Sequence, residues 1–196
     1  MRERLSAYVD EMRRAALTAV ATDRRGERTD IEATLRWTAE VMHQAHDGGK
    51  KIIFVGNGGS AGISSHLAID YTKNGGLRSL AFNDGAALTC LGNDLGYEYV
   101  FAKQIEMHGR TGDVLVAISS SGRSPNILKA VSAAREGGLV ILTLSGFGSD
   151  NPLRRLGDYN IYVASGEYGI VEVTHLALCH AILDFDMGWQ PNAQTT

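Results

Sequence analysis

Residues 113–124 read DVLVAISSSGRS, and this stretch decides the fold class. Val114 to Ile118 form a continuous apolar run rich in β-branched residues, which is typical of a strand buried on both faces of a parallel sheet. A hydroxyl-rich turn follows, and Pro125 stands where a helix would begin, with Ser124 as its N-cap. Such a cluster is often a simple turn. Here it lies between a buried strand and a helix N-terminus, whose free N–H groups and dipole favour a phosphate site.

Strand and helix patterns alternate on both sides of this stretch. The further predicted strands are 51–55, 79–82, 139–144 and 159–164. The predicted helices are 1–23, 30–46, 60–73, a short one ending near 92–94, 97–108, 125–136 and 169–185. The alternation predicts an α/β fold, a three-layer αβα sandwich with a parallel doubly wound sheet, preceded by two N-terminal helices. We expect one domain over 1–196, in which 1–48 is a helical segment for packing and oligomerisation.

The composition excludes several classes of protein. A chain of 196 residues with 44% hydrophobic residues can bury a sizeable core, and a net charge of −3 without a basic stripe argues against nucleic-acid binding. No apolar run approaches the length of a membrane span and the N-terminus is charged, so we expect a cytoplasmic protein without a membrane partner. Cys90 and Cys179 lie in apolar surroundings, which predicts two buried thiols and no disulfide.

The glycine-rich turn at 56–62 (GNGGSAG) follows the strand at 51–55 and leads into a helix. Its last glycine, Gly62, is one place too late for the dinucleotide pattern G-x-G-x-x-G, and no acidic residue ends a second strand where that fold needs one. The same glycines would let the backbone approach a sugar phosphate closely. The turn therefore favours a sugar phosphate over a dinucleotide.

Histidines and carboxylates recur on two predicted helices. His66 and Asp70 are four residues apart and share one helix face, which suits either half of a zinc site or a structural hydrogen-bonded couple. The last helix carries Glu172, His175 and His180. Glu172 and His180 are separated by about 12 Å along a regular helix, so spacing alone does not nominate them as ligands of one ion. His175 is interpreted as a core or supporting histidine.

Four motifs together resemble the phosphoheptose isomerases of the SIS (sugar isomerase) domain family: GNGGS at 56–60 with His66 downstream, GNDLGYE at 92–98, GDVLVAISSSGRSPNILKA at 112–130, and E-x-x-H-x-x-x-x-H at 172–180. The similarity runs from about Lys50 to Asp184. The resemblance implies conversion of sedoheptulose 7-phosphate to D-glycero-D-manno-heptose 7-phosphate through an enediol(ate), by a homotetramer with Zn²⁺ in its site, on a pathway to activated heptose.

The resemblance also implies roles for individual residues. The family's metal ligands fall on His66, Asp70, Glu172 and His180, with Asp70 as the catalytic base, Glu172 as its rival and His180 as the general acid. Its substrate contacts fall on Asn57, Gly58, Gly59, Asn93, Asp94, Ser119, Ser120, Ser121 and Ser124.

The sequence departs from the family at three site positions. Asp70 stands where Glu is usual, Glu172 where Gln is usual, and Gly169 where Asp is usual. These changes leave open an isomerase for a related ketose phosphate. Two other hypotheses remain. One is a non-enzymatic SIS regulator that associates with the bacterial replication initiator, and the presence of His180 argues against it. The other is a sugar-phosphate sensor, which would not need four metal ligands.

Overall fold

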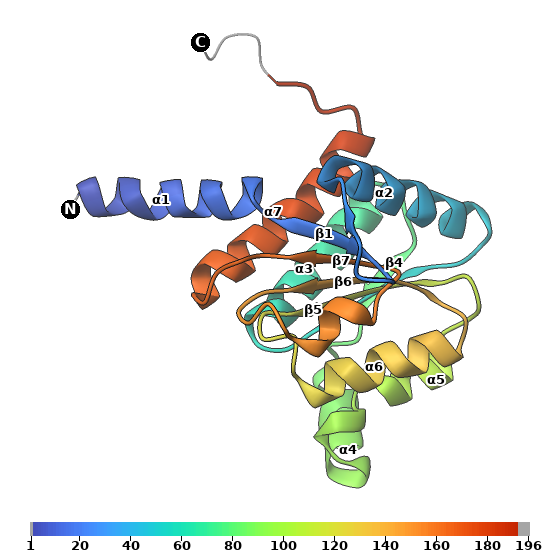
Figure 1. Ribbon diagram of the computed structural model, residues 1–196. Coiled ribbons are helices and arrows are strands. Elements are labelled where there is room, and N and C mark those ends of the chain that lie inside the picture. Colours follow the sequence, from blue (N-terminus) through green and yellow to red (C-terminus); the bar gives the residue numbers. More distant parts are fainter. Residues whose placement is uncertain (1, 192–196) are drawn as a thin grey trace.

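The computed structural model describes residues 2–191, and a single seven-stranded sheet runs through it (Figure 1). The strand order is β2-β1-β7-β6-β5-β3-β4. The strands are β1 (Val20–Asp23), β2 (Arg28–Thr29), β3 (Ile52–Gly56), β4 (Ser79–Ala81), β5 (Val114–Ser119), β6 (Val140–Ser145) and β7 (Tyr159–Tyr162). Strands β3 to β7 pair in parallel, whereas β1 pairs antiparallel with both β7 and β2. The predicted α/β sandwich is confirmed, but a wholly parallel sheet is wrong at this one edge.

Helices cover both faces of the sheet (Figure 1). On one face lie α2 (Ile31–Asp47), α3 (Gly59–Lys73) and α7 (Tyr168–Asp186), with α1 (Arg2–Leu17) packed on α7. On the other face lie α5 (Ala102–His108), α6 (Pro125–Glu136) and the 3₁₀ helices η1 (Tyr97–Tyr99) and η2 (Pro152–Arg155). Helix α4 (Gly85–Leu95) projects away from the sheet, next to η1.

Strand β3 shows why the central strands are apolar throughout. Ile52 and Phe54 belong to the core beneath α3 and α7, whereas Ile53 and Val55 belong to the core beneath α5 and α6. Since successive side chains of a strand point to opposite faces, a strand covered on both sides needs apolar residues at every position. Strand β5 follows the same rule, and all six of its residues are buried, as its sequence predicted.

The N-terminal segment is not entirely helical. The helix predicted over 1–23 ends at Leu17, and the chain then forms β1 and a short hairpin with β2, so the description of 1–48 as a helical segment is wrong for these strands. Ala21 and Thr22 are buried, and β1 pairs with β7 along its whole length. This pairing satisfies backbone groups of β7 that would otherwise form an exposed sheet edge. The helix predicted over 97–108 is likewise divided, into η1 and α5.

Helix α7 is, among the described residues, long and apolar enough to cross a membrane by length and composition. By this criterion the expectation that no segment approaches a membrane span is not met for α7, although Glu172, His175 and His180 interrupt its apolar sequence. It packs against α1, α2 and α3, and Val171, His175 and Cys179 on its inner side are at most 1% exposed. Helix α7 is thus a core helix of the sandwich.

Candidate active site

The serine turn after β5 is closed by its own hydrogen bonds. The Ser119 hydroxyl accepts from the backbone N–H of Gly122 at 3.2 Å and lies 3.3 Å from the Ser124 hydroxyl. Gly122 has a φ of +61°, and a Cβ there would overlap the side chain of Asn151, so only glycine suits this position. Ser124 occupies the N-cap position of α6 with extended backbone, but its hydroxyl makes no capping bond. The prediction that Ser124 is the N-cap residue of α6 is confirmed, although its hydroxyl faces Ser119 and not the backbone of the helix.

A cavity of about 280 Å³ opens at the carboxyl ends of β3 and β5. We call it the serine cavity, and its lining consists of Asn57, Gly58, Gly59, Ser60, Ile118, Ser119, Ser120, Ser121, Ser124, Tyr168 and Glu172. The Ser120 hydroxyl is buried and has no hydrogen-bond partner within the described residues, so it is free to donate to a ligand. Hydroxyl groups and the N-terminus of α3 meet here, an arrangement suited to an anion. Seven of the nine predicted substrate residues line this cavity.

Asn93 and Asp94 are the two that do not. Both are exposed on α4, where the Asn93 amide donates to the Asp94 carboxylate at 2.8 Å. Helix α4 projects from the body of the protein (Figure 1), so these two side chains lie outside the serine cavity of their own chain. Cys90 is on the same helix and is exposed, so its predicted burial is wrong, whereas Cys179 on α7 is buried as predicted.

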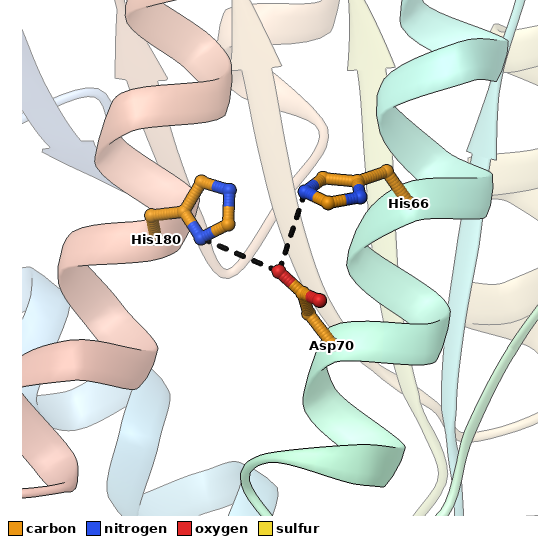
Figure 2. A group of neighbouring side chains, drawn as sticks. All are labelled: His66, Asp70 and His180. Carbon is orange, nitrogen blue, oxygen red and sulfur yellow. Dashed lines mark ion pairs between the residues drawn. The ribbon is translucent and has the colours of Figure 1, made fainter.

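A compact group of side chains lies between α3 and α7, formed by His66, Asp70 and His180. We call it the histidine–carboxylate group. One carboxylate oxygen of Asp70, Oδ2, lies 3.3 Å from Nε2 of His66 and 3.7 Å from Nδ1 of His180. Figure 2 shows the two imidazole rings approaching this carboxylate from different helices. One donor atom of each residue lies within 4.8 Å of the other two, so the group could hold a metal ion. The His66 side chain is 51% exposed, so the group is accessible from solvent.

The donor chemistry of this group suits zinc. Two imidazole nitrogens and one carboxylate oxygen are the three protein ligands found in one type of catalytic zinc site, which keeps a further position open for water or substrate. The second Asp70 oxygen, Oδ1, lies 3.5 Å from the amide nitrogen of Asn74. A carboxylate held by such a contact is oriented for its ligand role.

Glu172 does not join this group. Its carboxylate lies against Gly59 at the N-terminus of α3, where a Cβ on residue 59 would overlap it. Gly59 is therefore needed for this close approach. Glu172 and Gly59 meet at one end of the pair of helices, and His66 and His180 meet further along. As the spacing indicated, Glu172 is not among the residues that are grouped with His180.

His175 is a core residue. It is 0% exposed, and its Nε2–H donates to the carbonyl oxygen of Ser145 at 3.1 Å. Burial lowers the pKa of the imidazole to about 4, although the bond to Ser145 opposes this shift. His175 is therefore neutral near pH 7 and takes no part in the histidine–carboxylate group.

Ser60 and Tyr168 line the serine cavity but were not among the predicted site residues. Ser60 stands in the GNGGS motif, so the motif itself could have nominated it. Tyr168 begins α7 and packs edge-on against Phe147, whose φ is +56°. No local sequence signal indicates Tyr168, because its place depends on where the start of α7 meets the loop after β6.

Comparison with known proteins shows the family of this chain. The pattern of the SIS domain matches residues 9–146. The chain is 39% identical over 170 residues to a phosphoheptose isomerase of Bradyrhizobium sp. (strain ORS 278), which covers 81% of this chain and 84% of that protein. It is 38% identical over 160 residues to that of Aneurinibacillus thermoaerophilus, covering 77% and 80%.

A solved structure of a phosphoheptose isomerase from Neisseria gonorrhoeae superposes with a TM-score of 0.81 at 33% identity, covering 94% of this chain and 98% of that one. The match to the SIS domain spans more than half of the chain, and the curated relatives are similar over most of it. The chain therefore belongs to the SIS-domain family and, within it, to the phosphoheptose isomerases, which are aldose–ketose isomerases.

Proposed function

We propose that this chain isomerises sedoheptulose 7-phosphate to D-glycero-D-manno-heptose 7-phosphate by metal-assisted proton transfer through an enediol(ate). One observation supports this proposal above the others: the serine cavity and the histidine–carboxylate group lie at two places along the α3–α7 pair. From Gly59 to His66 and from Glu172 to His180 the helices advance by about 10 to 12 Å. An extended sugar phosphate can span such a distance, with its phosphate at one place and its carbonyl at the other.

The phosphate end of the substrate belongs in the serine cavity. Ser119, Ser120, Ser121 and Ser124 offer hydroxyl donors, and the backbone at Gly58 and Gly59 opens α3 with its dipole directed at the cavity. Hydrogen bonds to a charged phosphate are stronger than those between neutral groups. An anchored phosphate would hold the open-chain sugar in one orientation, which lowers the entropic cost of reaching the reacting geometry.

The carbonyl end belongs beside His66, Asp70 and His180, which would hold a zinc ion. Zinc bound there would polarise the substrate oxygens and lower the cost of the negative charge that develops on the enediolate. The family position also proposes Glu172 as a fourth ligand, which requires its carboxylate to leave Gly59.

Proton transfer is assigned to side chains of the same group. Asp70 takes the proton from C1 and His180, as general acid, helps deliver it at C2. Asp70 is the better supported base, because Glu172 faces the serine cavity and not the carbonyl end. Isomerisation in deuterium oxide should then place solvent label at C2 of the aldose. A product without solvent label that retains all of the transferred hydrogen would instead indicate a hydride shift and refute this mechanism.

Metal analysis tests the same proposal. Purified protein should contain one zinc per chain, and His66→Ala or His180→Ala should lose both the zinc and the activity while keeping the unfolding temperature within a few degrees. His108→Ala is a matched control, since it removes a histidine on α5, far from this group. Metal-free protein that still isomerises sugar phosphates would refute the metal-assisted mechanism, whereas metal-free protein that binds them without turnover would support a sensor.

The departures from the family favour a second candidate, an isomerase for a related ketose phosphate. Asp70 is one methylene shorter than the usual Glu, and Glu172 adds a carboxylate to the cavity wall. Both changes alter what the site presents to a sugar. A panel of ketose phosphates of different chain lengths, analysed by NMR for the matching aldose, decides between the two candidates.

We also propose a cytoplasmic homotetramer. Leu5, Tyr8, Val9 and Leu17 on α1 are between 46% and 69% exposed, and they would be covered if copies of the chain packed through this helix. Light scattering coupled to gel filtration should give a mass of four chains, against 21.1 kDa for one. A shared site would also let Asn93 and Asp94 of one chain serve a neighbouring chain.

A further inference from the structure

A pair of asparagine side chains lies next to the serine cavity. The Asn57 amide nitrogen donates to Oδ1 of Asn126 at 2.9 Å, and the Asn126 amide nitrogen donates back to Oδ1 of Asn57 at 2.8 Å. The Tyr97 hydroxyl also donates to Oδ1 of Asn57, at 3.0 Å. Three separate segments thus meet at one amide: the turn after β3, the first turn of α6, and η1.

These bonds determine which part of the Asn57 amide remains available. An amide oxygen accepts two hydrogen bonds and an amide nitrogen donates two. Both acceptor positions of Asn57 are filled, by Asn126 and Tyr97, whereas one N–H of its nitrogen is unused. Asn57 lines the serine cavity, so the group that it can offer to a ligand there is a donor.

We propose that Asn126 is a positioning residue, which holds the Asn57 amide so that this N–H, and not the carbonyl oxygen, is presented to the bound sugar phosphate. Asn126 is 2% exposed and is absent from the lining of the serine cavity; with Asn57, Tyr97 and Ser124 it lines a neighbouring cavity of about 490 Å³. Its influence on the serine cavity therefore passes through Asn57. An unpaired Asn57 could turn its oxygen toward the oxygens of the substrate and repel them. The inference depends on the proposed function, because it assigns the donor to the substrate of that same site.

Tyr97 fills the second acceptor position of the Asn57 amide oxygen and so connects the site to the segment formed by α4 and η1. It begins η1, directly after α4, and its side chain remains 60% exposed. Removing its hydroxyl frees one lone pair of Asn57 without opening a cavity in the core. Tyr99 is a matched control on the same 3₁₀ helix, since its ring packs against Lys129 at 4.2 Å and its hydroxyl makes no hydrogen bond within the described residues.

A double-mutant cycle tests the proposal. The variants are Asn57→Ala, Asn126→Ala and the double variant. Titration calorimetry with a pre-equilibrated mixture of the ketose and aldose phosphates measures the dissociation constant without net heat from turnover. Each single variant should weaken binding by about tenfold, the effect of losing one hydrogen bond to a charged group. The double variant should bind no more weakly than Asn57→Ala, because Asn126 acts through Asn57.

Kinetics separate positioning from a general structural role. Asn126→Ala should raise KM with kcat changed by less than about twofold, since it affects substrate binding and not the proton transfer. Tyr97→Phe, which should fold normally, is expected to weaken binding by about threefold in the wild-type background and to have no effect in Asn57→Ala. Tyr99→Phe should change neither value.

Additive losses in the double variant, or unchanged binding in both Asn126→Ala and Tyr97→Phe, would overturn the inference. Failure of the proposed function gives a different result: wild-type protein that binds the sugar phosphates but does not exchange hydrogen with solvent. In that case the binding cycle still decides whether Asn126 positions Asn57.

Discussion

Acid should destabilise this fold through one buried histidine. His175 is 0% exposed, and its Nδ1 has no hydrogen-bond partner within the described residues. Burial lowers its pKa from 6.5 to about 4 in the folded protein. At pH values between about 4 and 6.5, His175 binds a proton in the unfolded chain but not in the folded one. The stability that the neutral imidazole provides is therefore complete above pH 6.5 and is lost as the pH falls toward 4.

The size of this effect follows from the two pKa values. Proton linkage with a pKa of 6.5 in the unfolded chain and about 4 in the folded one removes about 2 kcal/mol of unfolding free energy between pH 7 and pH 5. For a domain whose total stability is about 5 to 15 kcal/mol, this loss is easily measured. The assay is urea unfolding followed by circular dichroism at both pH values, at one protein concentration and with a chelator present.

His175→Gln is the matched variant. The glutamine Nε2 can keep the bond to the Ser145 carbonyl, but this side chain does not titrate. The variant should lose about 2 kcal/mol less than wild type between pH 7 and pH 5, whatever its stability at pH 7. The other five histidines are present in both proteins, so their contributions cancel in the difference. Equal losses in the two proteins would refute the assignment of a buried neutral His175.

Three further outcomes are expected. A thiol reagent should modify the exposed Cys90 in the folded protein but not Cys179, because burial raises the pKa of the Cys179 thiol to about 12. Fast modification of both thiols would contradict the structure. Asp113→Ala should lower the free energy of unfolding by about 3 kcal/mol in denaturant, because this 1% exposed carboxylate accepts hydrogen bonds from two backbone N–H groups and from a lysine ammonium. A loss below about 1 kcal/mol would show that these three donors find other partners. Gly59→Ala should fold, because the added methyl group would meet only the flexible end of the Glu172 side chain. The variant should bind inorganic phosphate about tenfold more weakly, as measured by calorimetry. Unchanged affinity would show that the anion binds elsewhere.

Local signals in the sequence were sufficient for the central sheet. Strand β5 was predicted almost to the residue, because a continuous apolar run with β-branched residues leaves few alternatives when both faces are covered. The start of α6 was equally clear from Ser124 and Pro125. The role of the Ser124 hydroxyl was not, since its bond partner, Ser119, is chosen by the shape of the turn.

The N-terminal strands were missed for a related reason. Residues 20–23 are too few for a periodic pattern, and they follow directly on the apolar positions of α1. Their strand conformation depends on hydrogen bonds to β7, which lies almost 140 residues further along the chain. Local propensity carries no information about such a partner.

The sequence by itself determined the class of fold, the glycine and serine turns that line one cavity, and the spacing that puts His66 and Asp70 on one helix face. These features depend on neighbours along the chain, where backbone geometry and side-chain periodicity act. Only the tertiary structure decided that His180 meets this pair while Glu172 faces the serine cavity, and that Asn126 holds Asn57. Such contacts depend on how two helices pack side by side, and that packing is set by the shared core beneath them and not by the residues that meet in the site.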